Sequence, residues 1–190
     1  ALTLFLRHNY IPAPYSMYRG IRKLLPGTIL SIPHDVRRGT GPVDQPTPKP
    51  YWSARETAER GVKDPYCGSD LEAADHLEDL LRDAIGQQMV ADVPLGAFLS
   101  GGVDSSTIVA LMQSQSATPV RTFTIGFHDK AYNEAEHAAA VARHLGTDHT
   151  EMYITAGDAL AVIPQIPLLY DEPFADSSQI PTILISSLTF

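Results

Sequence analysis

The segment SGGVDSS, residues 100–106, constrains the fold of this chain more than any other segment does. It follows an apolar run, residues 93–99, that predicts a buried strand, and it precedes residues 107–112, which predict a helix. Glycines at such a turn let backbone N–H groups approach an anion, and the helix start adds free N–H donors and the positive end of the helix dipole. The turn therefore predicts a phosphate site, with an ordinary glycine turn capped by serine as the alternative.

Asp104 and the lack of a lysine narrow the kind of phosphate site. Asp104 has the same charge sign as a phosphate, so it fits the loop mainly if a cation lies between the two. The Walker A pattern requires a lysine that this loop lacks, and the G-x-G-x-x-G pattern of dinucleotide sites does not match either. The sequence therefore predicts a third type of phosphate loop that works with a metal ion.

Composition excludes several classes of function. A net charge of −8 argues against a general nucleic-acid or membrane-surface binder. The single cysteine, Cys67, excludes an intrachain disulfide framework and is typical of a reducing compartment. The sequence shows no signal peptide and no apolar run long enough to span a bilayer. We therefore expect a cytoplasmic protein that binds neither nucleic acid nor membranes.

Apolar periodicity around the loop predicts alternating helices and strands. A helix is expected to open at Asp70, with an apolar stripe that includes Leu71, Leu77 and Ile85. The later elements expected are strands at 120–127 and 149–154, and helices at 133–145, in part over 156–169, and from Gln179 onward. This order predicts an α/β fold with a doubly wound, mostly parallel sheet, on which a ligand binds at the carboxyl ends of the strands and at the switch point.

The composition also divides the chain into three parts. Residues 1–38 are apolar and rich in turns, which predicts a small β-containing remnant of a preceding domain. Residues 39–69 contain two Pro/Gly-rich loops and predict a linker, and residues 70–190 carry the α/β pattern. Because the sequence begins inside an apolar run and stops inside a predicted helix, we expect a fragment of a longer protein.

The motifs resemble those of one enzyme family. The pattern S-G-G-x-D-S resembles the pyrophosphate loop of the N-type ATP pyrophosphatases, which have an adenine nucleotide alpha hydrolase-like fold. The wider context is similar to glutamine-dependent asparagine synthetases in residues 95–99, 122–127, 132–134, 144–147 and 171–178. Residues 1–38 resemble the C-terminal tail of a class II glutaminase domain, and residues 70–190 the N-terminal part of the synthetase domain.

The resemblance assigns expected roles to individual residues. The expected ATP and pyrophosphate ligands are Leu99, Ser100, Gly101, Gly102, Asp104, Ser105, Ser106, Ile125 and Gly126. Asp104 would also hold Mg²⁺ against the pyrophosphate. The residues expected near the substrate are Asp171, Glu172, Asp176, Ser177 and Ser178, for which an ordinary helix cap is an equal alternative.

The resemblance also implies an activity and partners. It implies ATP-dependent adenylation of the aspartate side-chain carboxylate, followed by amidation with ammonia from glutamine, in a protein expected to be a homodimer. The rest of its own polypeptide would supply the glutaminase nucleophile and the late catalytic residues, so this segment alone is expected to be inactive. The alternatives are a related amidotransferase, a β-lactam-forming synthetase acting on another carboxylate, and a non-catalytic nucleotide-binding module.

Overall fold

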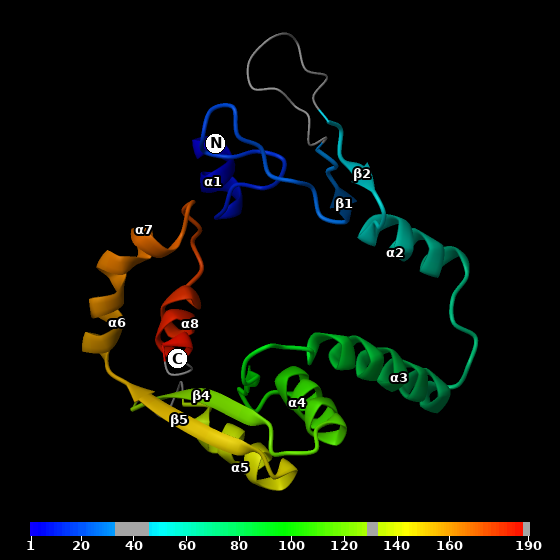
Figure 1. The fold of residues 1–190 in the computed structure, drawn as a ribbon, viewed down its shortest axis with the longest axis vertical. Helices are drawn as coiled ribbons and strands as arrows, with labels where there is room; N and C mark the ends of the chain where they lie inside the picture. The colour runs from blue at the N-terminus through cyan, green and yellow to red at the C-terminus, as the bar shows by residue number, and fades with distance from the viewer. Residues whose placement is uncertain (33–45, 129–132, 188–190) are drawn as a thin grey trace. The chain divides into compact units, whose positions relative to one another are not determined.

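The computed structural model describes residues 1–32, 46–128 and 133–187 (Figure 1). Contacts divide the chain into two compact units. Unit 1 contains Ala1–Cys67 and Pro167–Asp176, and unit 2 contains Gly68–Ile166 and Ser177–Phe190. The boundary predicted after residue 38 lies outside the described residues, and the predicted three-part division stays a prediction.

Unit 2 is built around a parallel sheet of three strands. These are β3 (Gly96–Phe98), β4 (Arg121–Phe127) and β5 (Asp148–Ile154), in the order β3-β4-β5. The connections are the helices α4 (Val103–Gln115) and α5 (Ala135–Leu145). This confirms the predicted α/β class with parallel strands. The doubly wound arrangement stays a prediction, because the order of the described strands contains no reversal.

The strand before the loop differs from its prediction. It was expected to be buried, but the side chain of Phe98 is 50% exposed and β3 pairs with β4 alone among the described strands. An edge strand has a neighbour on one side only, so an apolar sequence does not ensure burial there. The centre of the described sheet is β4, where Thr122, Phe123 and Thr124 are all buried.

Two hydrophobic clusters hold the helices of unit 2 together. One joins α3 (Asp70–Gln88) to α4 through Ile85, Leu111 and Met112. The other joins α4 to α5 and to the end of β3, and its buried members are Leu99, Val109, Ala138 and Ala142. Gly146, with a φ of 72°, ends α5 as the sequence predicted. Both clusters contain residues from the middle of α4, so packing holds the central part of this helix in place.

Helix α3 begins at Asp70, as predicted, but its N-cap is the preceding residue and only part of the helix is packed. Ser69, not Asp70, is the N-cap: its hydroxyl accepts from the N–H of Glu72, whose carboxylate accepts from the N–H of Ser69. The predicted stripe is buried at Ile85, but Leu71 at its start is 79% exposed. Only the second half of α3 contacts α4 through buried side chains.

The remaining helices of unit 2 follow β5. The predicted partly helical stretch consists of α6 (Ala156–Val162), a 3₁₀ turn (Ile163–Gln165) and the start of α7 (Ile166–Leu169), whose last three residues belong to unit 1. The predicted helix from residue 179 is α8 (Gln179–Ser186). It contacts β4. The prolines at 164 and 167 divide this stretch because proline lacks the N–H that a continuous helix needs.

Unit 1 contains short helices and a pair of short antiparallel strands. It holds α1 (Leu2–His8), and β1 (Thr28–Ile29) paired antiparallel with β2 (Lys49–Pro50). It also holds α2 (Ala54–Lys63), a helix within the predicted linker that was not expected. Ser53 caps α2 by accepting from the N–H of Glu56, so the S-x-x-E pattern there was the signal that could have predicted the helix.

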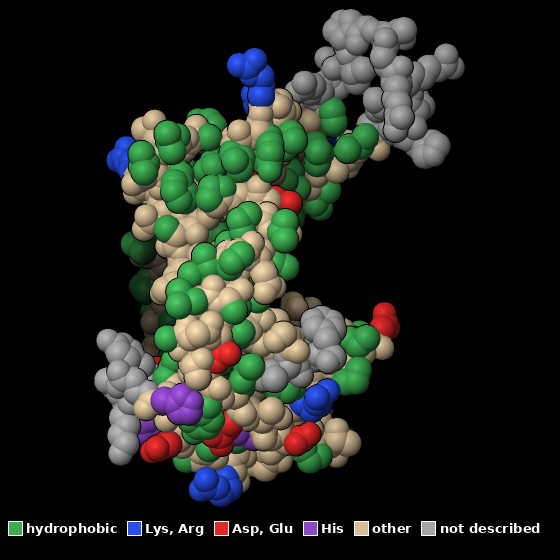
Figure 2. All heavy atoms as spheres, turned by 90° about the vertical axis from the view of Figure 1, so that its left-hand side faces the viewer, with side chains coloured by type: hydrophobic (Ala, Val, Ile, Leu, Met, Phe, Trp, Pro, Cys, Tyr) green, Lys and Arg blue, Asp and Glu red, His purple; other side chains and the backbone are tan. Residues whose placement is uncertain are grey.

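Hydrophobic side chains reach the surface of both units. Figure 2 shows several such patches in green on one face of the molecule. Large exposed side chains include Leu2 and Leu6 on α1 and Leu160 on α6. Within the described ranges, no helix is both long and apolar enough to cross a membrane.

Candidate functional site

The glycine loop lies between β3 and α4, as predicted, and is anchored at its start. The N–H of Leu99 donates to the carbonyl of Phe123 (2.9 Å), which extends the pairing with β4 by one residue. Leu99 itself is 1% exposed and belongs to the cluster under α4 and α5. The residue therefore holds the loop to the sheet, and its side chain has a packing role.

The two glycines have different local requirements. Gly101 has a φ of 78°, and a Cβ there would lie 2.7 Å from the backbone nitrogen of Ala138 on α5. Gly102 has a φ of −73°, which any residue adopts, and a Cβ there would meet only the Ser100 hydroxyl at 3.4 Å. The fold therefore requires a glycine at 101, whereas a Cβ at 102 would make only a contact with the Ser100 hydroxyl.

Hydroxyl groups close the loop upon itself. The Oγ atoms of Ser100 and Ser105 lie 2.9 Å apart. The N–H of Ser100 donates to the Ser105 hydroxyl (3.2 Å), and the N–H of Gly102 donates to the Ser100 hydroxyl (3.3 Å). The sequence predicts N–H groups that approach an anion here, and in this structure two of them donate to serine oxygens. A bound anion would take the place of those oxygens as acceptor.

The start of α4 offers further donors. The N-cap is Gly102, and no side chain caps the helix, so the N–H groups of Val103, Asp104 and Ser105 have no intrahelical acceptor. The Oγ atom of Ser106 is buried without a hydrogen-bond partner in the described part of the chain. Asp104 is exposed in the same first turn. The arrangement combines N–H donors, a hydroxyl and one carboxylate.

An open pocket of about 360 Å³ lies beside this loop, within unit 2. Its lining comes from the loop and β3 (Phe98, Leu99, Ser100, Ser105), from β4 and the residues after it (Phe123, Thr124, Ile125, Phe127, Glu134), and from the start of α8 (Ser178, Pro181, Thr182, Ile185). The pocket brings together the predicted residues Leu99, Ser100, Ser105, Ile125 and Ser178. The lining combines serine hydroxyl groups of the loop with apolar side chains of the strands, a combination typical of ligand pockets.

Ile125 and Gly126 were both expected to contact the nucleotide, but only Ile125 is among the lining residues of the pocket. Ile125 is half-buried and lines the pocket. Gly126 is buried and is not among the lining residues, and a Cβ there would lie 2.6 Å from the ring of Tyr153 on β5. The local packing against Tyr153 is thus sufficient to account for the glycine at 126.

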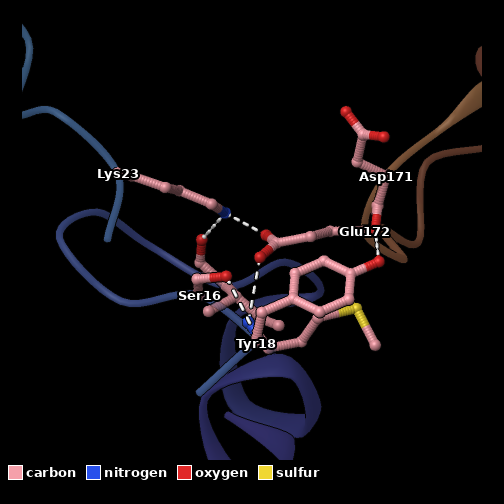
Figure 3. A network of polar contacts seen from close by, with 7 residues as sticks. Ser16, Tyr18, Lys23, Asp171 and Glu172 are labelled. Atoms are coloured by element: carbon pink, nitrogen blue, oxygen red, sulfur yellow. Dashed lines mark hydrogen bonds and ion pairs between the residues drawn. The ribbon is translucent and has the colours of Figure 1, made fainter. Parts of the chain in front are cut away.

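The expected substrate residues divide between the two units. Ser178 lines the pocket at the start of α8, and Ser177 precedes it in unit 2. Asp171, Glu172 and Asp176 belong to unit 1. There the carboxylate of Glu172 accepts from the N–H of Met17 (2.9 Å) and pairs with the ammonium of Lys23 (Figure 3).

The sequence analysis missed several lining residues of the pocket. Thr124, Phe127 and Glu134 flank the end of β4, and Thr182 lies on α8. The alternation of Phe123, Ile125 and Phe127 along one strand was a signal for the side that faces the pocket. The contribution of α8 has no comparable sequence signal, because it depends on where a distant helix packs.

Two carboxylates lie at the candidate site, that of Asp104 in the first turn of α4 and that of Glu134 in the lining of the pocket. Within the described residues, no group of three or more His, Cys, Asp or Glu side chains could hold a metal ion. Mg²⁺ typically uses one or two carboxylates and takes its other ligands from phosphates and water. Asp104 therefore fits a metal that arrives with a phosphate ligand and does not fit a site made of protein groups alone.

Comparison with known proteins places the chain in a family. The family model described as asparagine synthase matches residues 76–189. The chain belongs to the asparagine synthase family. The matched region contains the glycine loop, the pocket residues of β4 and the start of α8.

Individual relatives agree with this assignment. A protein of Methanocaldococcus jannaschii, provisionally named glutamine-hydrolyzing asparagine synthetase 2, is 34% identical over 99% of this chain and 34% of its own length. A Mycobacterium bovis protein with a similar provisional name is 32% identical over 94% of this chain and 26% of its own. Glutamine-hydrolyzing asparagine synthetase 1 of Bacillus subtilis is 27% identical over 98% of this chain and 27% of its own. The chain thus spans about a quarter to a third of the length of these relatives.

Proposed function

We propose that this chain is the ATP-binding part of a glutamine-hydrolyzing asparagine synthetase. The observation that carries the proposal is the glycine loop opening onto the pocket beside β4. In this assignment the loop, residues 100–106, binds the pyrophosphate, and the apolar side chains of Phe123 and Ile125 contact the adenosine. The glycine at 102 supports this assignment, because neither its φ nor its surroundings require a residue without a side chain.

The proposed chemistry makes ATP an adenylating reagent. The side-chain carboxylate of aspartate would attack the α-phosphorus, the bond to the β-phosphate would break, and pyrophosphate would leave. Ammonia derived from glutamine would then displace AMP from the acyl-adenylate to give the amide. Donors aimed at the leaving group stabilise the charge that develops on it, and the N–H groups at the start of α4 would supply such donors.

We also propose that Asp104 holds Mg²⁺ against the pyrophosphate. The carboxylate is exposed and lies in the first turn of α4, next to the N–H donors. A bound Mg²⁺ would neutralise charge on the departing pyrophosphate. Without a cation, the Asp104 carboxylate would repel the phosphates at this position.

We also propose that the sheet belongs to the doubly wound class. Helices α5 and α8 both contact β4 and lie on opposite sides of the strands in Figure 1. Helices on both faces are a feature of the doubly wound class. A ligand at the carboxyl end of β3, where the glycine loop begins, agrees with the usual position in such sheets.

Calorimetric titration of this chain with ATP tests the binding assignment. With Mg²⁺ present, we expect Asp104→Asn to weaken ATP binding about tenfold or more, which is ~1.4 kcal/mol. In EDTA the same variant should bind ATP as well as the parent chain does, or better, because one repelling charge is removed. Asp75→Asn on the exposed surface of α3 is the matched control and should change neither affinity. An equal loss with and without Mg²⁺ would remove the metal from the role of Asp104.

The activity is tested with the protein expressed from its complete gene. Asparagine formation from aspartate, glutamine and ATP should be lost in Asp104→Asn, while glutamine hydrolysis continues. Release of pyrophosphate with another carboxylate, and none with aspartate, would instead support a related amidotransferase or a β-lactam-forming synthetase. ATP binding without pyrophosphate release for any carboxylate would support a non-catalytic module.

A further inference from the structure

A network of polar contacts in unit 1 joins two segments that lie about 150 residues apart in the sequence (Figure 3). The ammonium of Lys23 pairs with the carboxylate of Glu172 and also donates to the carbonyl of Ile11 (2.6 Å). The other carboxylate oxygen of Glu172 accepts from the N–H of Met17 (2.9 Å). Both oxygens of one carboxylate are therefore engaged by the N-terminal segment.

The surroundings keep the Glu172 carboxylate ionised. The hydrogen bond from the Lys23 ammonium, followed by that from the Met17 N–H, lowers the pKa of Glu172 to about 2. The hydroxyl of Ser16 acts in the same direction, while burial opposes it. Only 15% of the Glu172 side chain is exposed, compared with 37% for Lys23. Each oxygen of this carboxylate thus already has a partner in the N-terminal segment.

Two further hydrogen bonds fasten the same segment. The hydroxyl of Tyr18 donates to the carbonyl of Asp171 (2.9 Å), and the N–H of Ala175 donates to the carbonyl of Asn9 (2.7 Å). The segment is thus held at three points, residues 171, 172 and 175. Each partner lies between residues 9 and 23, so the contacts form one interface and are not scattered.

The fastened segment leads directly into the pocket. Two residues, Asp176 and Ser177, separate Ala175 from Ser178, where the lining of the pocket begins on α8. A chain held at residue 175 gives the start of α8 fewer conformations than a free chain would. Contacts made by residues 9–23 therefore restrict the chain that enters α8.

We propose that Lys23 and Glu172 are a positioning pair, which fastens residues 171–175 to the N-terminal segment and so orders the start of α8 at the nucleotide pocket. Glu172 then acts through Ser178 and does not bind substrate. The effect on the pocket rests on the proposed ATP site, whereas the fastening itself does not. The pair would make nucleotide affinity depend on a segment that the family resemblance assigns to the tail of a glutaminase domain.

Three variants and a control test the pair. Glu172→Gln removes the charge and keeps an acceptor for the Met17 N–H, Lys23→Met removes the ammonium, and Lys23→Arg keeps a cation. Glu59→Gln on α2 is the matched control, because it removes one carboxylate from another ion pair of unit 1, with Arg55. Hydrogen exchange at residues 171–182 reports the fastening, and ATP titration reports the pocket.

The expected pattern is specific to a positioning pair. Glu172→Gln and Lys23→Met should each raise hydrogen exchange at residues 171–182, and each should raise the apparent Kd for ATP about threefold by reducing the competent fraction. The double variant should resemble either single variant, because both remove the same interaction. Lys23→Arg and Glu59→Gln should behave like the parent chain.

Other patterns overturn the inference in distinguishable ways. A large loss of ATP affinity in Glu172→Gln with no effect of Lys23→Met would make Glu172 a ligand. Faster exchange in both variants at an unchanged Kd would confine the pair to holding unit 1 together. If the parent chain binds no ATP, the proposed function is contradicted. Hydrogen exchange at residues 177–182 would then be the measurement that decides whether the pair positions the start of α8.

Discussion

The two glycines of the 100–106 loop should differ in their effects, Gly101 on stability and Gly102 on ATP binding. A Cβ at Gly101 would force a φ of 78° on a residue with a side chain and would clash with the backbone of α5. We expect Gly101→Ala to lower the free energy of unfolding by roughly 1–3 kcal/mol. Gly102→Ala should change it by less than about 0.5 kcal/mol and yet weaken ATP binding. Urea unfolding and ATP titration measure the two effects, and equal stabilities of the two variants would contradict the assignment.

His149 is a half-buried titratable group that is not among the lining residues of the pocket. Its Nδ1 atom lies 2.9 Å from the Thr122 hydroxyl, and its Nε2 atom is buried without a hydrogen-bond partner in the described residues. Burial lowers the pKa of His149, against the opposite effect of Glu151. The unfolded chain therefore binds more protons below about pH 6.5, the usual histidine value.

Stability should accordingly be full above about pH 6.5 and fall as the pH drops below it. His149→Gln should remove part of this slope in urea unfolding measured from about pH 5 to pH 8. His144→Gln on α5, whose side chain is exposed, is the control and should retain the slope. An unchanged slope in His149→Gln would exclude this histidine as its source.

Helices α2 and α3 have similar serine caps but different packing. Ser69 caps α3, which has Ile85 in a hydrophobic cluster, whereas Ser53 caps α2, which has no buried residue. A capping bond supports global stability only where the helix is coupled to the core. We expect Ser69→Ala to lower the free energy of unfolding by about 1 kcal/mol and Ser53→Ala to leave it nearly unchanged. Urea unfolding followed by circular dichroism checks this, and a larger loss in Ser53→Ala would contradict it.

Ligand binding should affect the two units of the molecule differently. The proposed ATP ligands lie in unit 2, so ATP with Mg²⁺ should slow hydrogen exchange at residues 97–106, 123–127 and 178–185. Exchange in α2 of unit 1, residues 54–63, should stay the same. A concentration of 100 times Kd would stabilise the binding-competent state by ~2.7 kcal/mol. Protection confined to α2 would place the nucleotide elsewhere.

Local sequence determined the elements that carry the candidate site. The glycine loop, the helix after it and the strands β4 and β5 follow from short-range patterns, and Gly146 ends α5 where predicted. Such features depend on residues within one or two turns, so a single sequence contains them. The same holds for α2, whose S-x-x-E cap was present in the sequence but was outweighed by the neighbouring prolines and glycines.

Only the tertiary structure decided which of these residues meet. The sequence placed Glu172 and Ser178 in one polar cluster, and the contacts separate them, because Lys23 binds one while α8 brings the other to β4. It also predicted a buried strand at Phe98, whose exposure depends on having a neighbour on one side only. Burial, ion pairing and pocket lining depend on residues that are distant in the sequence, such as Lys23 and Glu172. The chain's local pattern therefore determined the loop and its chemistry, while long-range packing decided what surrounds it.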